Sequence, residues 1–410
     1  MNKKINLAVA GALLVAASAA NAGIIIPAGE WTLDINGNVN AFATMYNYDD
    51  STLASGGLSG AKSGVEDTSQ SINTGLLPAW LGFTGTTRQN DLDVSWTISM
   101  QPNVSDNDGG AGDNTSAKWR QTFLTFGDKS WGSVKIGKDL GIFAGTAILN
   151  DMTLLGVGGN AGSVGGATSG AKTSLGGIGT GYIYPSWVGQ LAYTTPIMNG
   201  LQATIAITNP NHSNMIGASA GAAGTNSAYQ DSFGLEGQVT YSFAQGKIWV
   251  SGMSQNQQAA NTAGAVDWDQ QALDIGANVN IGNLGLVGYY YNGKGVGSTF
   301  RGGVFGSADT DAGVTQTGQE RDSDGGYIQA TYVIPTGTKL GVAYGVSSLD
   351  KANAADATHL DENNRWTVGA YHPLTKHLNL VAEFNQVESK DHAGVTSEGD
   401  AVSLGAILFF

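Results

Sequence analysis

The chain has 410 residues and a formal net charge of -14; 13% of its residues are charged, 61 are glycine and none is cysteine. A soluble domain of ordinary composition has about 25% charged residues and about 7% glycine, so this chain lacks the usual charged surface. Its 9% aromatic and 41% hydrophobic residues exclude intrinsic disorder, its few Lys and Arg residues argue against nucleic-acid binding, and the lack of Cys excludes thiolate metal sites and disulfides.

The first 22 residues have the pattern of a secretory signal peptide. A cationic start, Met1-Asn2-Lys3-Lys4, precedes an apolar run from Leu7 to Ala20 and the cleavage signal Ala20-Asn21-Ala22. The alternative, a buried N-terminal helix, would need polar residues at helical spacing. We predict a signal peptide over residues 1–22 and a single domain over residues 23–410. No later stretch approaches the roughly 18 apolar residues of a spanning helix, so a membrane location would require a closed β-barrel.

From Leu33 onward, apolar and polar residues alternate with a period of two, which is typical of half-buried strands. Sixteen such runs follow one another: 31–48, 72–86, 91–104, 117–127, 132–138, 182–196, 200–209, 231–243, 246–255, 270–282, 284–292, 325–335, 338–348, 364–372, 377–387 and 399–410. In the first run Phe42 is the only large apolar residue on the polar face, and the apolar face carries the small residues Gly37, Ala41 and Ala43.

The connections between these runs alternate between short turns and long polar loops. Up-and-down outer-membrane barrels have this arrangement, whereas a soluble sandwich or a β-helix, the two alternatives, does not require it. The fold class is therefore all-β, and we predict a transmembrane antiparallel up-and-down β-barrel of about 16 strands whose first and last strands pair. Its apolar positions face lipid, its polar positions face the interior, and a barrel of this size encloses an aqueous channel.

Four segments resemble the trimeric general-diffusion porins of Gram-negative outer membranes. They are Trp131-Gly132-Ser133-Val134-Lys135-Ile136-Gly137-Lys138-Asp139, Tyr193-Thr194-Thr195-Pro196-Ile197-Met198-Asn199-Gly200-Leu201, Tyr371-His372-Pro373-Leu374-Thr375-Lys376-His377 and the C-terminal Ser403-Leu404-Gly405-Ala406-Ile407-Leu408-Phe409-Phe410. Lys138 and His377 replace the arginines usual in that family. The resemblance implies passive diffusion of small hydrophilic solutes and ions, contact with outer-membrane lipid and lipopolysaccharide, and a homotrimer, which the small residues of the first strand also suit.

The resemblance assigns roles to two further segments. The C-terminal one resembles the signal read by the barrel-assembly machinery, with Gly405, Leu408 and Phe410 as its key positions. The longest connection, residues 139–181, corresponds to the third long loop, which in the family folds into the barrel and constricts the pore. Its glycines and apolar residues suit packing against an inner wall, although they would equally suit a mobile surface loop.

Few charges are available to that constriction. The loop contains Asp139, Asp151 and Lys172, and the facing wall offers Arg120, Lys135 and Lys138. We predict a mostly neutral, polar constriction with a weak transverse field, although each of these charges also suits a plain solvated strand. Most of the 33 acidic residues fall in the long loops, where they would attract cations, bridge to lipopolysaccharide through divalent ions, or simply keep the loops soluble.

Nothing in the sequence indicates an enzyme. The five histidines form no metal-binding or nucleophile-activating pair, and Gly156-Val157-Gly158 lacks the βαβ frame of a dinucleotide site. We expect no cofactor and no catalytic residues. The favoured function is a porin for passive diffusion; the alternatives are a substrate-specific porin for a sugar or an organic acid, and a loop-displaying adhesin or structural outer-membrane protein.

Overall fold

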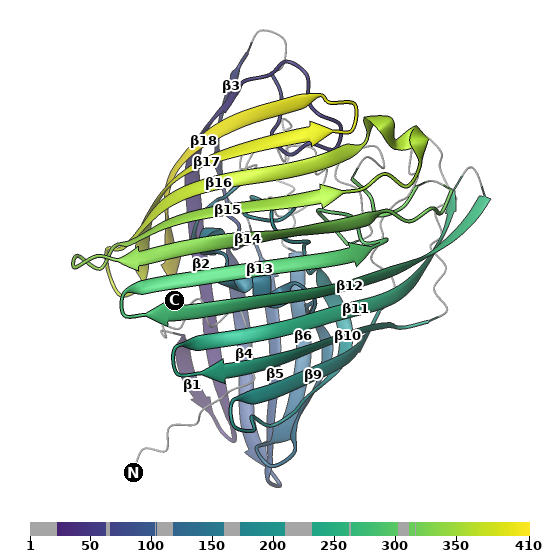
Figure 1. Cartoon of the computed structure of the whole chain (residues 1–410). Coiled ribbons are helices and arrows are strands. Elements are labelled where there is room, and N and C mark those ends of the chain that lie inside the picture. The colour runs from purple at the N-terminus through teal and green to yellow at the C-terminus, as the bar shows by residue number, and fades with distance from the viewer. Residues whose placement is uncertain are drawn as a thin grey trace, which may run out of the picture.

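The computed structural model describes residues 23–62, 66–102, 104, 118–159, 173–209, 232–261, 264–301, 311–315 and 317–410. The predicted signal peptide lies outside these residues. Nearly all regular structure is β, and Figure 1 shows the strands curving around one barrel. The strands are β1 (Ile24–Ala28), β2 (Trp31–Tyr48), β3 (Thr68–Asn73), β4 (Trp80–Gln89), β5 (Leu92–Gln101), β6 (Lys118–Asp128), β7 (Gly132–Leu140), β8 (Trp187–Thr194), β9 (Leu201–Thr208), β10 (Gly234–Phe243), β11 (Gly246–Asn261), β12 (Gly264–Ile281), β13 (Leu284–Lys294), β14 (Asp322–Val333), β15 (Lys339–Leu349), β16 (Leu360–Pro373), β17 (Leu378–Asp391) and β18 (Thr396–Phe409).

Three short helices complete the described structure: α2 (Gly145–Asn150), η1 (Met152–Leu155) and η2 (Ala354–Thr358). Among the described residues, no helix is long and apolar enough to cross a membrane.

The sheet closes on itself at β2. One edge of β2 pairs with β18, for example Asn38 with Phe409, and the same edge continues along β1, where Ile35 pairs with Ile24. The other edge of β2 pairs with β4 and β3, which together occupy one strand position. The remaining strands pair antiparallel with their neighbours in chain order. The prediction of a closed, antiparallel barrel of 16 strands is confirmed.

Along β2, the polar residues point into the barrel and the apolar residues point outward, as predicted. Asn38, on the polar face, is 1% exposed and lies inside the barrel, whereas Val39 and Met45 on the other face are 55% and 62% exposed. These outward side chains form the apolar surface that a barrel presents to lipid. Phe42 points inward despite being apolar, and it packs beneath loop residues inside the barrel.

Several predicted boundaries are wrong. The run over residues 182–196 begins only at Trp187, the first residue of β8. The run over residues 72–86 is divided into β3 and β4, because the backbone N–H of Gly75 donates to Asn40 and that of Leu76 donates to the Gly156 carbonyl, which draws this segment inward. The predicted loop between residues 255 and 270 is instead a hairpin, since β11 and β12 pair from Gln255–Gln270 out to Asn261–Gly264. Asp269, within that predicted loop, therefore lies on β12. Glu388 also lies on a strand, because β17 extends to Asp391, beyond the predicted end of its run at residue 387.

The C-terminus completes the barrel through Gly37. The backbones of Gly37 and Phe410 exchange two hydrogen bonds of 2.8 and 3.0 Å. A Cβ at Gly37 would lie 2.3 Å from the Trp80 carbonyl oxygen and 2.7 Å from the Phe410 ring. The small size of this residue thus serves a contact within the chain. Gly405 likewise leaves room for Phe42, because a Cβ there would lie 2.2 Å from the Ala41 carbonyl oxygen and 2.5 Å from the Phe42 ring.

We expect Gly37→Ala to destabilise the barrel by roughly 1–3 kcal/mol, the usual cost of overpacking. The matched control is Gly288→Ala on β13, where nothing lies within 4 Å of the added Cβ. Urea unfolding in detergent, followed by tryptophan fluorescence, measures the difference. Equal unfolding midpoints for the two variants would show that the Gly37–Phe410 contact does not stabilise the closure.

Candidate functional site

The loop between β7 and β8, residues 141–186, folds inside the barrel; we call it the internal loop. It contains α2 and η1, and its described residues are mostly buried and none is exposed. Ala144 precedes α2 in the left-handed conformation, with φ 58°. Asp151 caps η1, since its side chain accepts a hydrogen bond of 2.9 Å from the backbone N–H of Thr153. The loop therefore has regular structure of its own.

The outgoing limb of the internal loop is held by two carboxylates of the inner wall. Glu236 on β10 accepts hydrogen bonds from the backbone N–H groups of Ile142 and Phe143, at 2.7 and 2.9 Å. Asp274 on β12 accepts one from Ala144 at 3.0 Å. Because hydrogen bonds to charged acceptors are stronger than neutral ones, these contacts fix the start of the loop to the wall.

A third wall carboxylate holds the middle of the loop. Glu383 on β17 accepts hydrogen bonds from the backbone N–H groups of Val157 and Gly158, at 2.9 and 2.8 Å, and from the hydroxyl of Tyr371 at 2.7 Å. The loop passes very close to this carboxylate, because a Cβ at Gly156 would lie 1.9 Å from its Oε1 atom. Gly156 is therefore the residue that permits the approach.

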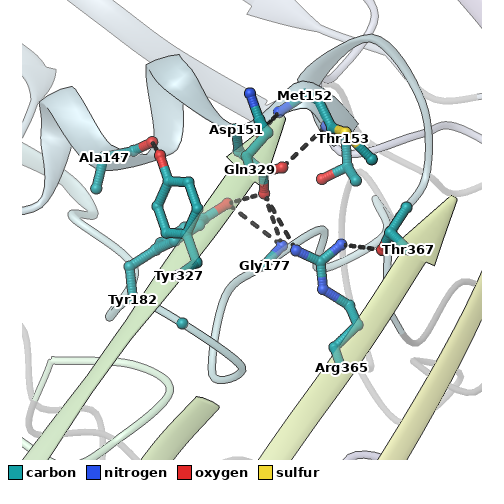
Figure 2. A network of polar contacts seen from close by, with 12 residues as sticks. Ala147, Asp151, Met152, Thr153, Gly177, Tyr182, Tyr327, Gln329, Arg365 and Thr367 are labelled. Atoms are coloured by element: carbon teal, nitrogen blue, oxygen red, sulfur yellow. Dashed lines mark hydrogen bonds and ion pairs between the residues drawn. The ribbon is translucent and has the colours of Figure 1, made fainter. Parts of the chain in front are cut away.

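Asp151 is the centre of a buried polar network (Figure 2). Its Oδ2 atom accepts hydrogen bonds from the Tyr182 hydroxyl at 2.8 Å and from the backbone N–H of Gly177 at 3.0 Å. The guanidinium of Arg365, on β16 of the wall, lies 3.7 Å from the same oxygen, and both side chains are 1% exposed. Asp151 thus joins the two limbs of the internal loop to each other and to the wall.

Two side chains of β14 add further contacts. The Tyr327 hydroxyl donates to the Ala147 carbonyl at 2.8 Å, and the Gln329 side chain accepts from the backbone N–H of Met152 at 2.6 Å. Figure 2 shows Tyr327 beside Tyr182, and their ring centroids are 5.8 Å apart. Together these contacts place the internal loop against the inner face of β10–β17.

The two limbs of the loop also touch directly. Gly158 and Gly176 form an isolated β-bridge, and both have positive φ, 63° and 57°. A Cβ at Gly158 would lie 2.4 Å from the Cα of Gly176. Glycine is needed here because an L side chain would be strained by the backbone conformation and would meet the opposite limb.

Two predicted pore residues, Lys135 and Asp139, lie together on the lumen side of β7. They form an ion pair, and Asp139 also accepts a hydrogen bond of 3.0 Å from Gln121 on β6. The Lys135 ammonium lies 4.9 Å from the centroid of the Phe123 ring. These strands are outside the β10–β17 arc that carries the internal loop.

The other predicted residues lie elsewhere. Successive side chains of a strand point to opposite faces, and Lys138 shares the outer face of β7 with Ile136, which is 44% exposed. The prediction of Lys138 as a pore residue is therefore wrong. Arg120 lies where the register of β5 and β6 shifts, and its guanidinium stands 5.8 Å from the centre of the Trp187 ring. Asp151 is a buried anchor of the loop. Lys172 lies outside the described residues.

Sequence reasoning missed the wall anchors Glu236, Asp274, Arg365 and Glu383. The alternation of the strands does show that each of these residues faces the lumen, as Arg365 does two residues before Thr367. No pattern in the sequence shows which lumen-facing residues lie beneath a loop. Among the described residues, no group of three or more His, Asp and Glu side chains could hold a metal ion.

A closed 16-stranded barrel with a loop held inside it defines an outer-membrane channel architecture. A family model described as Gram-negative porin matches residues 8–392, and the chain belongs to that family. Family and fold identify an outer-membrane channel for diffusion. No curated protein sequence matches the chain.

Solved structures share the fold at low sequence identity. The outer-membrane channel DcaP of Acinetobacter baumannii has a TM-score of 0.67 and 15% identity, covering 94% of this chain and 99% of its own. An anion-selective porin from Comamonas acidovorans has a TM-score of 0.62 and 16% identity, with 93% and 100% covered. Salmonella typhi OmpF, solved with daunomycin, has a TM-score of 0.61 and 16% identity, with 94% and 100% covered.

Proposed function

We propose that the chain is a general-diffusion porin with a nearly neutral constriction, passing small hydrophilic solutes and ions with mild or no charge selectivity. The observation that supports it is that the charged side chains near the internal loop are engaged in hydrogen bonds and ion pairs. Asp151 and Arg365 face each other in a buried pair, and Glu236, Asp274 and Glu383 accept backbone hydrogen bonds from the loop. Charges committed in this way do not line a water-filled passage, so the transverse field is weak.

A second candidate is a substrate-specific porin for a sugar or an organic acid. The observation that favours it is that another extracellular loop also folds inward. The backbone N–H of Leu58, in the β2–β3 loop, donates to Asn363 at 3.1 Å and to Ser389 at 2.9 Å, both inside the barrel. An entrance narrowed in this way provides surfaces that a particular solute could bind.

Liposome swelling separates the candidates. For general diffusion, we expect swelling rates that fall steadily with the size of neutral sugars and that rise linearly with concentration. Saturation by one sugar or organic acid at low concentration would favour the specific porin. Liposomes that do not swell with any solute would contradict both and favour an adhesin or structural protein.

We further propose a homotrimer, assembled in the outer membrane with lipopolysaccharide around it, after the barrel-assembly machinery has recognised the C-terminal segment containing Gly405, Leu408 and Phe410. The small outward side chains of Ala41 and Ala43 on β2 support close packing between subunits. Sedimentation of the protein in density-matched detergent tests this proposal, and a monomer mass would contradict it.

A further inference from the structure

The β13–β14 loop also enters the barrel. Its described parts are residues 295–301, 311–315 and 317–321. The first limb crosses the inner face from β13 to β10, where Arg301 meets Glu236. The loop is tightly folded, since a Cβ at Gly313 would lie 2.3 Å from the backbone of Gly295. Residues 299–301, which we call the clamp, lie inside the barrel against its inner wall, since Thr299 and Arg301 are 0% and 2% exposed.

The clamp contacts the outgoing limb of the internal loop through a buried charge. Arg301 Nη1 donates to Glu236 Oε1 at 2.6 Å, and the two side chains are 1% and 2% exposed. The other oxygen of Glu236 accepts the N–H groups of Ile142 and Phe143. Arg301 thus balances the charge of the carboxylate that fixes the start of the internal loop.

The clamp also contacts the returning limb. The backbone N–H of Tyr184 donates to the Thr299 carbonyl at 2.9 Å, and the rings of Tyr184 and Phe300 meet edge to face, with centroids 5.8 Å apart. A Cβ at Gly179 would lie 2.8 Å from the Thr299 hydroxyl. One short segment of the β13–β14 loop therefore touches both limbs of the internal loop.

We propose that the clamp is a second structural part of the pore constriction and that Arg301 is a positioning residue, which sets the width of the passage by holding Glu236 and, through it, the internal loop. The inference rests on the proposed function, because a passage must conduct before its width matters. It assigns the β13–β14 loop a role in the pore that neither its length nor its composition indicates.

The test is the single-channel conductance of Arg301→Met in planar bilayers, together with the size of neutral polymers that the pore excludes. The substitution leaves the buried Glu236 carboxylate without its cation, which loosens the start of the internal loop. We expect larger conductance steps, more open-channel noise and a larger exclusion size than in the wild type.

The matched control is Arg321→Met in the same loop. Arg321 is equally buried, but it pairs with Asp356 of the β15–β16 loop and donates to the Ala312 and Val314 carbonyls of its own loop, whereas Glu236 is bound by Arg301. The conductance steps of Arg321→Met should therefore equal those of the wild type.

A rescue separates positioning from general damage. Glu236→Gln combined with Arg301→Met removes both charges and keeps an oxygen that can accept the N–H groups of Ile142 and Phe143, so wild-type conductance should return. Heat-modifiable gel mobility confirms that each variant forms a barrel. A wild-type protein that does not conduct would overturn the proposed function itself. A conducting wild type with Arg301→Met indistinguishable from Arg321→Met, or with no rescue, would overturn the clamp alone.

Discussion

Replacing Asp151 with alanine is expected to release the internal loop from the wall and to raise both the conductance and the open-channel noise of the pore. Asp151 accepts hydrogen bonds from Thr153, Gly177 and Tyr182, and it faces the guanidinium of Arg365. The variant leaves the Arg365 charge buried without this carboxylate. Breaking a buried pair on one side costs about 3–5 kcal/mol.

The barrel itself should survive this change, because Asp151 lies in the loop and takes no part in strand pairing. Asp151→Asn keeps an acceptor oxygen and should give an intermediate effect. Asp361→Ala, at the start of β16, breaks an exposed ion pair with Lys390 and a contact with His392; it is the matched control and should leave conductance unchanged. Single-channel recordings that do not distinguish Asp151→Ala from Asp361→Ala would show that the Asp151 network does not hold the constriction.

Replacing Lys135 with glutamine is expected to shift the reversal potential in a KCl gradient toward cation selectivity. Lys135 lies on the lumen side of β7 beside Asp139, so the substitution removes a cation and leaves the carboxylate on the wall. Lys138→Gln changes the same type of residue three positions later, on the outer face, and should cause no shift. The pair of variants isolates the lumen charge from the general loss of a lysine.

The effect of Lys135→Gln should shrink as the salt concentration rises. The Debye length falls from about 10 Å at 0.1 M to about 3 Å at 1 M, so a single wall charge acts over less of the passage. Equal reversal potentials for Lys135→Gln and the wild type at 0.1 M KCl would place Lys135 outside the conducting path. A shift in Lys138→Gln would contradict its outward placement.

Much of the barrel could be predicted from the sequence because lipid imposes a strict rule. A strand with lipid on one side and water on the other must alternate, and the run over residues 31–48 coincides with β2 for this reason. Prediction failed where that rule does not apply. The end of β11, from Ser254 to Gln258, carries polar residues on both faces, so it left no period-two signal.

The internal site could be predicted only in outline. The position and length of residues 139–181 indicated a special loop, but the contacts that hold it join residues far apart in the chain, such as Val157 and Glu383. Many lumen-facing residues alternate in the same way, and the sequence does not distinguish those beneath the loop from those beside open water. Arg365 illustrates this, since its role depends on the path of the loop above it.

The measurement that tests the central claim most directly is the current through single molecules of the purified wild-type protein in a planar bilayer. The account predicts discrete conductance steps that scale with the bulk conductivity of the salt solution and a reversal potential close to zero in a KCl gradient. Absence of steps would contradict the water-filled channel, and a reversal potential near the limit for one ion would contradict the nearly neutral constriction.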